Sequence, residues 1–243
     1  MIATTTDPSG ALPTEHGANS PEHHRTRVKI CGLTRAQDVD AAVAAGADAI
    51  GLVLYEHSPR FVSLEQAAAL ARRLPPFVTP VLLFVNASAQ QVSSAVNQIA
   101  GATLQFHGDE TPSQCLSLAQ GRPFLRAARI PPGERGREFD LVKYAAEYSA
   151  AQAILLDTHS EGFGGAGKIF EWSLLPPSVN SHLVLSGGLT PANVIAGILQ
   201  VRPRCKSLAV DVSSGVEASK GIKDANKINQ FISAVRAADQ SHV

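Results

Sequence analysis

Short apolar runs and longer segments of helical periodicity alternate along the chain from Arg27 to its end. Each run of β-branched or aliphatic residues is followed by a polar or glycine-bearing loop and then by an alanine- or leucine-rich segment. Short apolar runs in this setting predict buried strands. The eight expected strands are Val28–Cys31, Ala49–Leu54, Thr79–Val85, Thr103–His107, Phe124–Ile130, Ala153–Asp157, His182–Ser186 and Leu208–Val212.

The segments between these strands predict helices, because their apolar residues recur at helical spacing. The expected helices are Arg35–Ala45, Leu64–Leu74, Ala89–Ala100, Pro112–Ala119, Glu138–Ser149, Pro191–Leu199 and Ala225–Ala237. The weakest segment follows the sixth strand, where Glu171–Leu175 allows one short helical turn before Pro176–Pro177 ends it.

The spacing of the repeat favours a single-domain (β/α)8 barrel. Residues 27–243 divided among eight units give roughly 27 residues each, which suits a barrel of about 250 residues. A doubly wound open sheet has the same alternation and is the alternative. Polar residues favour the barrel, because they follow nearly every expected strand at the end where barrel active sites are built. In chain order these groups are Cys31, Arg60, Asn86, His107, Arg129, Asp157, Gly187–Gly188 and Ser213–Ser214–Gly215.

Residues 1–26 are rich in Thr, Ser, Pro, Gly and His, which predicts a flexible tail in front of the barrel domain at 27–243. The tail lacks the basic start and hydrophobic middle of a secretory signal, so we expect no export. We interpret His16, His23 and His24 as solvated residues of this tail and not as metal ligands. No metal site is expected elsewhere in the chain.

The composition excludes several classes of partner. Lys and Arg together number 21, as do Asp and Glu, so no overall field attracts nucleic acid or an anionic membrane. No apolar run approaches the ~18 residues that cross a bilayer. The three cysteines, Cys31, Cys115 and Cys205, are odd in number and far apart, which fits neither a disulfide framework nor a zinc site. We therefore expect a cytoplasmic protein.

Cys31 is the first candidate for chemistry. It ends the first expected strand and precedes Gly32, which predicts a sulfur at the mouth of the barrel. Lys29 lies two residues earlier on the same side of the strand, and the helix expected from Arg35 adds a dipole, so both favour a thiolate. The alternative is a buried structural cysteine, which is the reading we prefer for Cys115 and Cys205.

Asp157 is the second candidate. It closes the sixth apolar run, where partial burial would suit its carboxyl to donate a proton. A helix cap or a loop ion pair is the alternative. The glycine-rich segment 159–168 that follows is typical of a lid that closes over a substrate, with a plain surface loop as the alternative.

Two neighbouring loops predict a phosphate site. Gly187 and Gly188 follow the seventh strand and precede a helix expected to begin at Pro191, so unpaired backbone N–H groups should face a ligand. Ser213, Ser214 and Gly215 repeat the arrangement after the eighth strand. Many barrels bind phosphate at these two positions.

The remaining candidates are side chains that could line a substrate site. Arg60, stiffened by Pro59, is expected to grip a carboxylate through two parallel hydrogen bonds, or else to be a solvated surface arginine. Gln105 and His107 point to one side of the fourth strand, and His107 could equally be a hydrogen-bonded residue at the strand end. Asp211, on the eighth strand, is counted with them among the substrate-binding residues.

Six segments in order resemble the signature blocks of the phosphoribosylanthranilate isomerases: VKICGLTR, AIGLVLYEHSPRFVS, LQFHGDE, AILLDTHSEGFGGAGKIFEW, LVLSGGLTPANV and AVDVSSGVEASKGIKD. The resemblance spans residues 27–237. It implies a cofactor-free barrel enzyme of tryptophan biosynthesis that performs an Amadori rearrangement of N-(5-phosphoribosyl)anthranilate, either as a monomer or as a homodimer.

The resemblance also implies roles for individual residues. Cys31 matches the general base of the family, Asp157 its general acid and Arg60 the arginine that holds the anthranilate carboxylate. The phosphate would be bound by backbone amides near Gly187–Gly188 and Ser214–Gly215. The chain departs from the family pattern at Phe106, Ala166, Glu171 and Ala218–Ser219–Lys220, which leaves the acid and the base unchanged.

Two other functions compete with this one. A related sugar-phosphate isomerase of histidine biosynthesis performs the same rearrangement on another substrate, but its members usually place an aspartate where this chain has Cys31. A barrel that binds a phosphometabolite without turnover is the other alternative. The presence of both a candidate base and a candidate acid argues against it.

Overall fold

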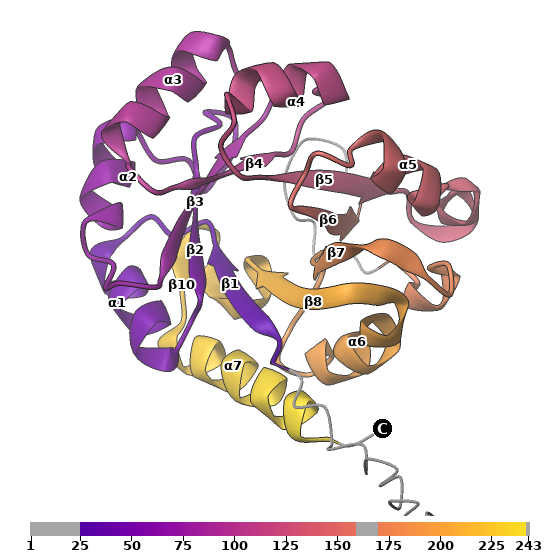
Figure 1. The fold of residues 1–243 in the computed structure, drawn as a ribbon. Helices are drawn as coiled ribbons and strands as arrows, with labels where there is room; N and C mark the ends of the chain where they lie inside the picture. Colours follow the sequence, from indigo (N-terminus) through magenta and orange to yellow (C-terminus); the bar gives the residue numbers. More distant parts are fainter. Residues whose placement is uncertain (1–24, 159–169, 242–243) are drawn as a thin grey trace, which may run out of the picture.

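A computed structural model describes residues 25–158 and 170–241 of the chain, and Figure 1 shows their arrangement. Most of the expected tail, residues 1–24, lies outside these residues, as does the expected lid at 159–168. Within the described part of the chain, no helix has the length and apolar character needed to span a membrane.

The strands form a closed parallel barrel in sequence order, which confirms the barrel and excludes the open sheet. The barrel closes where β1 pairs with β8, in a register that places Lys29 opposite Asp211. The strands are β1 Arg27–Cys31, β2 Ala49–Val53, β3 Thr79–Phe84, β4 Thr103–Phe106, β5 Phe124–Ile130, β6 Ala153–Thr158, β7 Val179–Leu185 and β8 Cys205–Val212.

Helices surround the barrel and connect most of its strands (Figure 1). The α-helices are α1 Ala36–Ala45, α2 Leu64–Ala71, α3 Ala89–Gln98, α4 Pro112–Ala119, α5 Leu141–Glu147, α6 Val194–Val201 and α7 Ala225–Gln240. The 3-10 helices are η1 Gly133–Glu138, η2 Trp172–Leu174, η3 Arg202–Arg204 and η4 Ser214–Val216. The turn expected at Glu171–Leu175 is thus confirmed as η2.

The structure adds one element that the sequence pattern did not indicate. Strands β9 Glu217–Ser219 and β10 Ile222–Lys223 form a two-stranded antiparallel hairpin between β8 and α7. With three and two residues, these strands are too short to display a period-two pattern.

Alternation along the strands divides the molecule into an outer core and a barrel interior. Ile30, Leu52 and Leu104 belong to the large apolar cluster that also contains the helices. Their neighbours Cys31 and Val53 belong to a separate small cluster, because successive side chains of a strand point to opposite faces. The buried polar residues Lys29, Gln105 and Asp211 occupy interior positions of the same kind.

The second described residue, Thr26, already packs against the rest of the structure. Thr26 is buried, and its backbone N–H and hydroxyl donate to the carboxylate of Asp239 on α7 at 2.8 and 2.7 Å. Arg202 also pairs with Asp239. Thr26, which the sequence suggested as the last residue of the tail, therefore joins the start of β1 to the last helix.

Candidate active site

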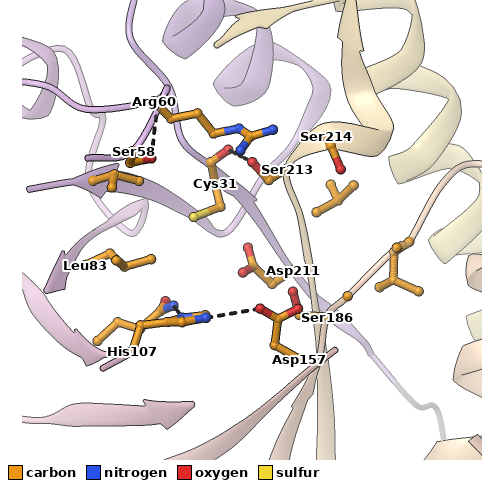
Figure 2. A pocket seen from close by; sticks show the side chains of 16 residues that line it. Cys31, Ser58, Arg60, Leu83, His107, Asp157, Ser186, Asp211, Ser213 and Ser214 are labelled. Carbon is orange, nitrogen blue, oxygen red and sulfur yellow. Dashed lines mark hydrogen bonds and ion pairs between the residues drawn. The ribbon is translucent and has the colours of Figure 1, made fainter. Parts of the chain in front are cut away.

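One pocket lies at the carboxyl ends of the strands, where Figure 2 shows the side chains that face it. It receives residues from β1, β2, β3, β4, β6, β7 and β8 or from the loops that follow them. Its lining consists of Cys31, Val53, Ser58, Arg60, Leu83, Gln105, His107, Asp157, Ser186, Gly187, Gly188, Leu189, Asp211, Val212, Ser213 and Ser214.

Cys31 presents its thiol to this pocket from the end of β1 (Figure 2). The space for the sulfur exists because β2 has a glycine opposite: a Cβ on Gly51 would lie 2.6 Å from Cys31 Sγ. Burial raises the pKa of the Cys31 thiol, and nearby Lys29 opposes this effect without cancelling it. Loss of hydration thus outweighs the lysine and works against the thiolate that the sequence suggested.

Lys29 and Asp211 form a buried ion pair beneath Cys31. The Lys29 Nζ lies 2.9 Å from Asp211 Oδ1, and the two side chains are 5% and 6% exposed. Burial acts to lower the pKa of Lys29, but the charges of Asp211 and Cys31 outweigh it, so the pKa is raised. Lys29 is thus a fixed cation two residues from the thiol.

Asp157 is held by a histidine that directly follows β4. His107 Nε2 lies 3.0 Å from Asp157 Oδ2, and His107 Nδ1 lies 3.0 Å from Gln105 Nε2 (Figure 2). With the amide nitrogen of Gln105 donating to Nδ1, the ring proton is on Nε2 and is donated to the carboxylate of Asp157. The two alternatives considered for His107 are both correct: it is hydrogen-bonded at the strand end, and it also lines the pocket.

The loop after β7 uses two glycines. Gly187 and Gly188 have positive φ angles of 77° and 67°, which favour glycine. A Cβ on Gly187 would lie 2.7 Å from the backbone N of Thr158 and 3.0 Å from Asp157 Oδ1, so this glycine also makes room for the carboxyl.

The loop after β8 packs directly on the loop after β7. A Cβ on Gly215 would lie 1.9 Å from the carbonyl oxygen of Leu189, so only glycine permits this approach. Ser213 donates from its hydroxyl to the carbonyl of Cys31 at 3.0 Å. The two loops therefore form one continuous wall that also contacts β1.

Arg60 reaches the pocket from the loop after β2. Its Nε and Nη2 donate to the two carboxylate oxygens of Glu217 at 2.7 and 2.8 Å. Lys223 Nζ lies 2.9 Å from Glu217 Oε1. Burial acts to raise the pKa of Glu217, but Arg60 and Lys223 outweigh it and hold the pKa below its usual value.

This arrangement is suited to moving protons on a small anionic molecule. A thiol and a carboxyl enter one pocket from different strands, and a histidine contacts the carboxyl. Buried cations stand beside the thiol and at the pocket wall. Within the described residues, no cluster of three or more His, Cys, Asp or Glu is placed to bind a metal ion.

A family model described as N-(5'phosphoribosyl)anthranilate (PRA) isomerase matches residues 28–234. The chain belongs to the phosphoribosylanthranilate isomerase family. The N-(5'-phosphoribosyl)anthranilate isomerase of Leptothrix cholodnii is 65% identical over 215 residues, which are 88% of this chain and 93% of that protein.

Solved structures of the family have the same barrel. The crystal structure of phosphoribosyl anthranilate isomerase from Thermotoga maritima is 39% identical, with a TM-score of 0.76 over 88% of this chain and all of that one. A crystal structure of phosphoribosyl anthranilate isomerase in complex with reduced 1-(o-carboxyphenylamino)-1-deoxyribulose 5-phosphate is 38% identical, with a TM-score of 0.73. This match covers 88% of the present chain and all of the chain in that crystal structure.

The pocket gathers the residues that the sequence selected for the family site, with one exception. Gly215 does not line it and instead supports the wall from behind, against Leu189. Arg129 and Asn86, expected at the mouth of the barrel, do not line the pocket either. Both contact Asp109, through Arg129 Nη2 at 3.1 Å and Asn86 Nδ2 at 3.4 Å.

The helix expected at Pro191 begins three residues later, at Val194. The side chain of Asn193 accepts from the N–H of Thr190 and donates to the carbonyl of Gly188, which holds the chain in a turn. The N–H of Thr190 is therefore occupied, and the helix that was expected to begin at Pro191 begins at Val194 instead.

Sequence reasoning missed Glu217 and Lys223, the buried partners of Arg60. Both lie in the segment that follows Gly215, where the pattern indicated no strand. The turn at Gly221, between two short segments that each carry a charged residue, was the available signal.

Proposed function

We propose that Cys31 and Asp157 are the general base and general acid for the isomerisation of N-(5'-phosphoribosyl)anthranilate, the activity and tryptophan-biosynthesis role that the family gives this chain. The observation that carries the proposal is their meeting in one pocket from β1 and β6, strands that are not neighbours in the barrel. Nothing but closure of the barrel brings this thiol and this carboxyl together.

The reaction needs four proton transfers, and the first two take place at the two atoms that flank C1, the ring oxygen and C2. Asp157 donates a proton to the furanose oxygen, and the C1–O bond breaks as the nitrogen lone pair forms a C1=N bond. Cys31, as thiolate, then removes the proton from C2, and the electrons form a C1=C2 bond and return to nitrogen. Gain of a proton at C1 and loss of one from the C2 hydroxyl give the ketone, so product and substrate have the same composition.

His107 and Gln105 can form hydrogen bonds that suit either protonation form of Asp157. In the arrangement described above, His107 donates to Asp157 Oδ2, which suits the carboxylate form. Within the described residues Gln105 Oε1 has no hydrogen-bond partner, so turning the amide exchanges one unpaired atom for another. With the amide turned, Gln105 Oε1 accepts from His107 Nδ1–H, and His107 Nε2 accepts from a protonated Asp157. This arrangement holds one more proton than the first, taken up from solvent, and that proton is the one that Asp157 donates to open the ring.

The two ends of the substrate would be anchored by different parts of the wall. The positive φ angles of Gly187 and Gly188 and the close packing of Gly215 support a phosphate site on the backbone of the two loops, with Ser213 and Ser214 beside it. Arg60 would receive the anthranilate carboxylate, and Asp211 would act through Lys29. Anchoring both ends orients the reacting carbons between them.

The test is the decay of phosphoribosylanthranilate fluorescence with purified wild-type protein, Cys31→Ala and Asp157→Asn. Loss of a positioned proton-transfer group lowers turnover by about 10²- to 10⁴-fold, and we expect each variant to fall in this range while remaining folded. Cys205→Ala and Asp40→Asn are matched controls, because both residues lie outside the pocket. Wild-type protein without turnover refutes the activity, whereas full turnover in either variant refutes only that residue's role.

We propose further that the chain works in the cytoplasm and forms no assembly larger than a homodimer. All three cysteines are unpaired, which fits a reducing compartment. The Thermotoga maritima isomerase is described as dimeric and has been converted to monomers. Light scattering on the purified chain should give one or two times 25.5 kDa, and a larger mass refutes the proposal.

A further inference from the structure

We propose that Glu217 and Lys223 are positioning residues that fix the guanidinium of Arg60 for recognition of the substrate's carboxylate. The inference rests on the proposed function, in which Arg60 receives that group. It assigns a recognition role to the β9–β10 hairpin, which carries both residues.

The contact with Glu217 fixes the plane of the guanidinium. Two parallel hydrogen bonds, from Nε and Nη2 at 2.7 and 2.8 Å, occupy one edge of the Arg60 fork. Within the described part of the chain, Arg60 Nη1 makes no hydrogen bond, and Arg60 lines the pocket. A bidentate pair fixes the orientation of the guanidinium, so the remaining edge of Arg60, which includes Nη1, is held in one direction.

Lys223 prevents Glu217 from neutralising Arg60. Lys223 Nζ lies 2.9 Å from Glu217 Oε1, and the Lys223 side chain is fully buried. One carboxylate between two cations leaves one positive charge in excess, which a second carboxylate can match. An Arg60–Glu217 pair alone would be neutral and would attract an anion far less.

Lys223 also joins this group to the wall of the proposed phosphate site. Its Nζ donates to the carbonyl of Ser213 at 3.0 Å and lies 3.3 Å from Ser213 Oγ. The Ser213 hydroxyl in turn donates to the carbonyl of Cys31. The contacts that orient Arg60 thus continue into the loop after β8 and the end of β1.

The stem of Arg60 and the hairpin are fixed independently of these charges. A Cβ on Gly32 would lie 2.4 Å from Arg60 Cδ, so the glycine lets the stem pack against the loop after β1. Thr34 on the same loop donates from its hydroxyl to the carbonyl of Gly221 at 2.7 Å, and the N–H of Lys223 donates to Asp38 at 3.2 Å. The stem of Arg60 therefore packs against the loop after β1, and the hairpin that carries its two partners is held by this loop and by α1.

The test compares two ligands that differ only in the carboxylate. The first is reduced 1-(o-carboxyphenylamino)-1-deoxyribulose 5-phosphate, and the second is the same molecule with hydrogen in place of the carboxyl group. Their inhibition constants are measured with wild type, Glu217→Gln, Glu217→Asp and Lys223→Met. Asp40→Asn is the matched control, because Asp40 makes the same bidentate pair with Arg73 on the exposed surface.

We expect Glu217→Gln and Lys223→Met to reduce the preference for the carboxylated ligand by about tenfold or more, since each weakens a buried charge-assisted contact. Glu217→Asp, which keeps the charge, should restore part of the preference. KM should rise more than kcat falls, because uniform binding is lost at one end of the substrate. The affinity for inorganic phosphate should stay within about twofold in Glu217→Gln, whose side chain does not contact the loop after β8. Asp40→Asn should match wild type.

An unchanged preference in folded Glu217→Gln and Lys223→Met would overturn the inference. Equal weakening of both ligands and of phosphate would also overturn it, because that is the result of a structural role. If Glu217→Gln does not fold, Glu217→Asp and Lys223→Met decide the matter. Wild-type turnover of phosphoribosylanthranilate with an unchanged preference in these variants refutes the inference and leaves the proposed function intact.

Discussion

Gly51 leaves open the space that the thiol of Cys31 fills, since a Cβ at this position would lie 2.6 Å from Cys31 Sγ and 3.0 Å from its Cα. The two residues are partners in the pairing of β1 with β2. The absence of a side chain at Gly51 on β2 therefore leaves the position that the sulfur of Cys31 on β1 occupies.

Gly51→Ala should displace the thiol and lower kcat by about tenfold or more, because misplacing a reacting group by ~1 Å costs on the order of a hundredfold. The added methyl group also overpacks the barrel interior, and we expect about 1–3 kcal/mol of destabilisation. Steady-state kinetics and thermal unfolding measure the two effects. An unchanged kcat with a lower Tm would show that the exact place of the sulfur is unimportant.

Lys29→Met should move the rise of kcat/KM to higher pH. The pKa of Cys31 is already raised by burial, and Lys29 is the main influence that opposes this rise. The thiolate exists above the pKa, so a further increase lowers the active fraction at neutral pH, about tenfold for each pH unit. A pH–rate profile measures the shift, and Lys206→Met, at an exposed position on β8, is the control.

The same variant leaves the buried carboxylate of Asp211 without its cation, which lowers stability. Lys29→Met with Asp211→Asn should recover part of that stability and only part of the pH profile, because removing the Asp211 charge relieves one influence that raises the pKa of Cys31 while the opposing cation is still missing. Recovery of the wild-type profile by the double variant would contradict the role given to Lys29.

His107→Asn should reduce kcat by about 10- to 100-fold with little change in KM, the usual effect of removing a group that orients a functional residue. The reason is the loss of the contact between His107 Nε2 and Asp157 Oδ2. Gln105→Leu should act in the same direction and more weakly, because it removes only the group that holds the ring. A change confined to KM in both variants would indicate that His107 serves binding alone.

Gly215→Ala should weaken the binding of phosphate. The new methyl group would lie 1.9 Å from the carbonyl oxygen of Leu189 and must push apart the loops after β7 and β8. We expect the inhibition constant of inorganic phosphate and the KM to rise by about tenfold, which corresponds to about 1.4 kcal/mol of binding free energy. Equal inhibition of wild type and variant would remove these loops from the phosphate site.

Short apolar runs made most of the barrel predictable. They identified all eight barrel strands, because a strand buried on both faces has an almost continuous apolar sequence, and period-two alternation placed Gln105 and His107 on the same side of β4. The starts of β7 and β8 were placed too late. Their first residues, Val179 and Cys205, pair before a register irregularity that interrupts the alternation.

The less predictable part of the site consists of charge pairs between distant residues. Arg60 was expected to hold a carboxylate through two parallel bonds, and the structure places Glu217 in that position. The two residues are separated by 157 positions, so no local pattern relates them. Which cation a buried carboxylate will meet is decided by the closed barrel and not by neighbouring sequence.

The bonds that join β1 to β8 have a consequence for the newly made protein. Lys29 with Asp211 and Cys31 with Ser213 each span 182 positions, so the second member of each pair is synthesised near the end of translation. A nascent polypeptide that stops before Cys205 has the Cys31 thiol but lacks the carboxylate that pairs with Lys29, the loop that contains Ser213 and the strand that covers the edge of β1. We therefore expect such incomplete chains to be inactive and, with that edge uncovered, prone to aggregate.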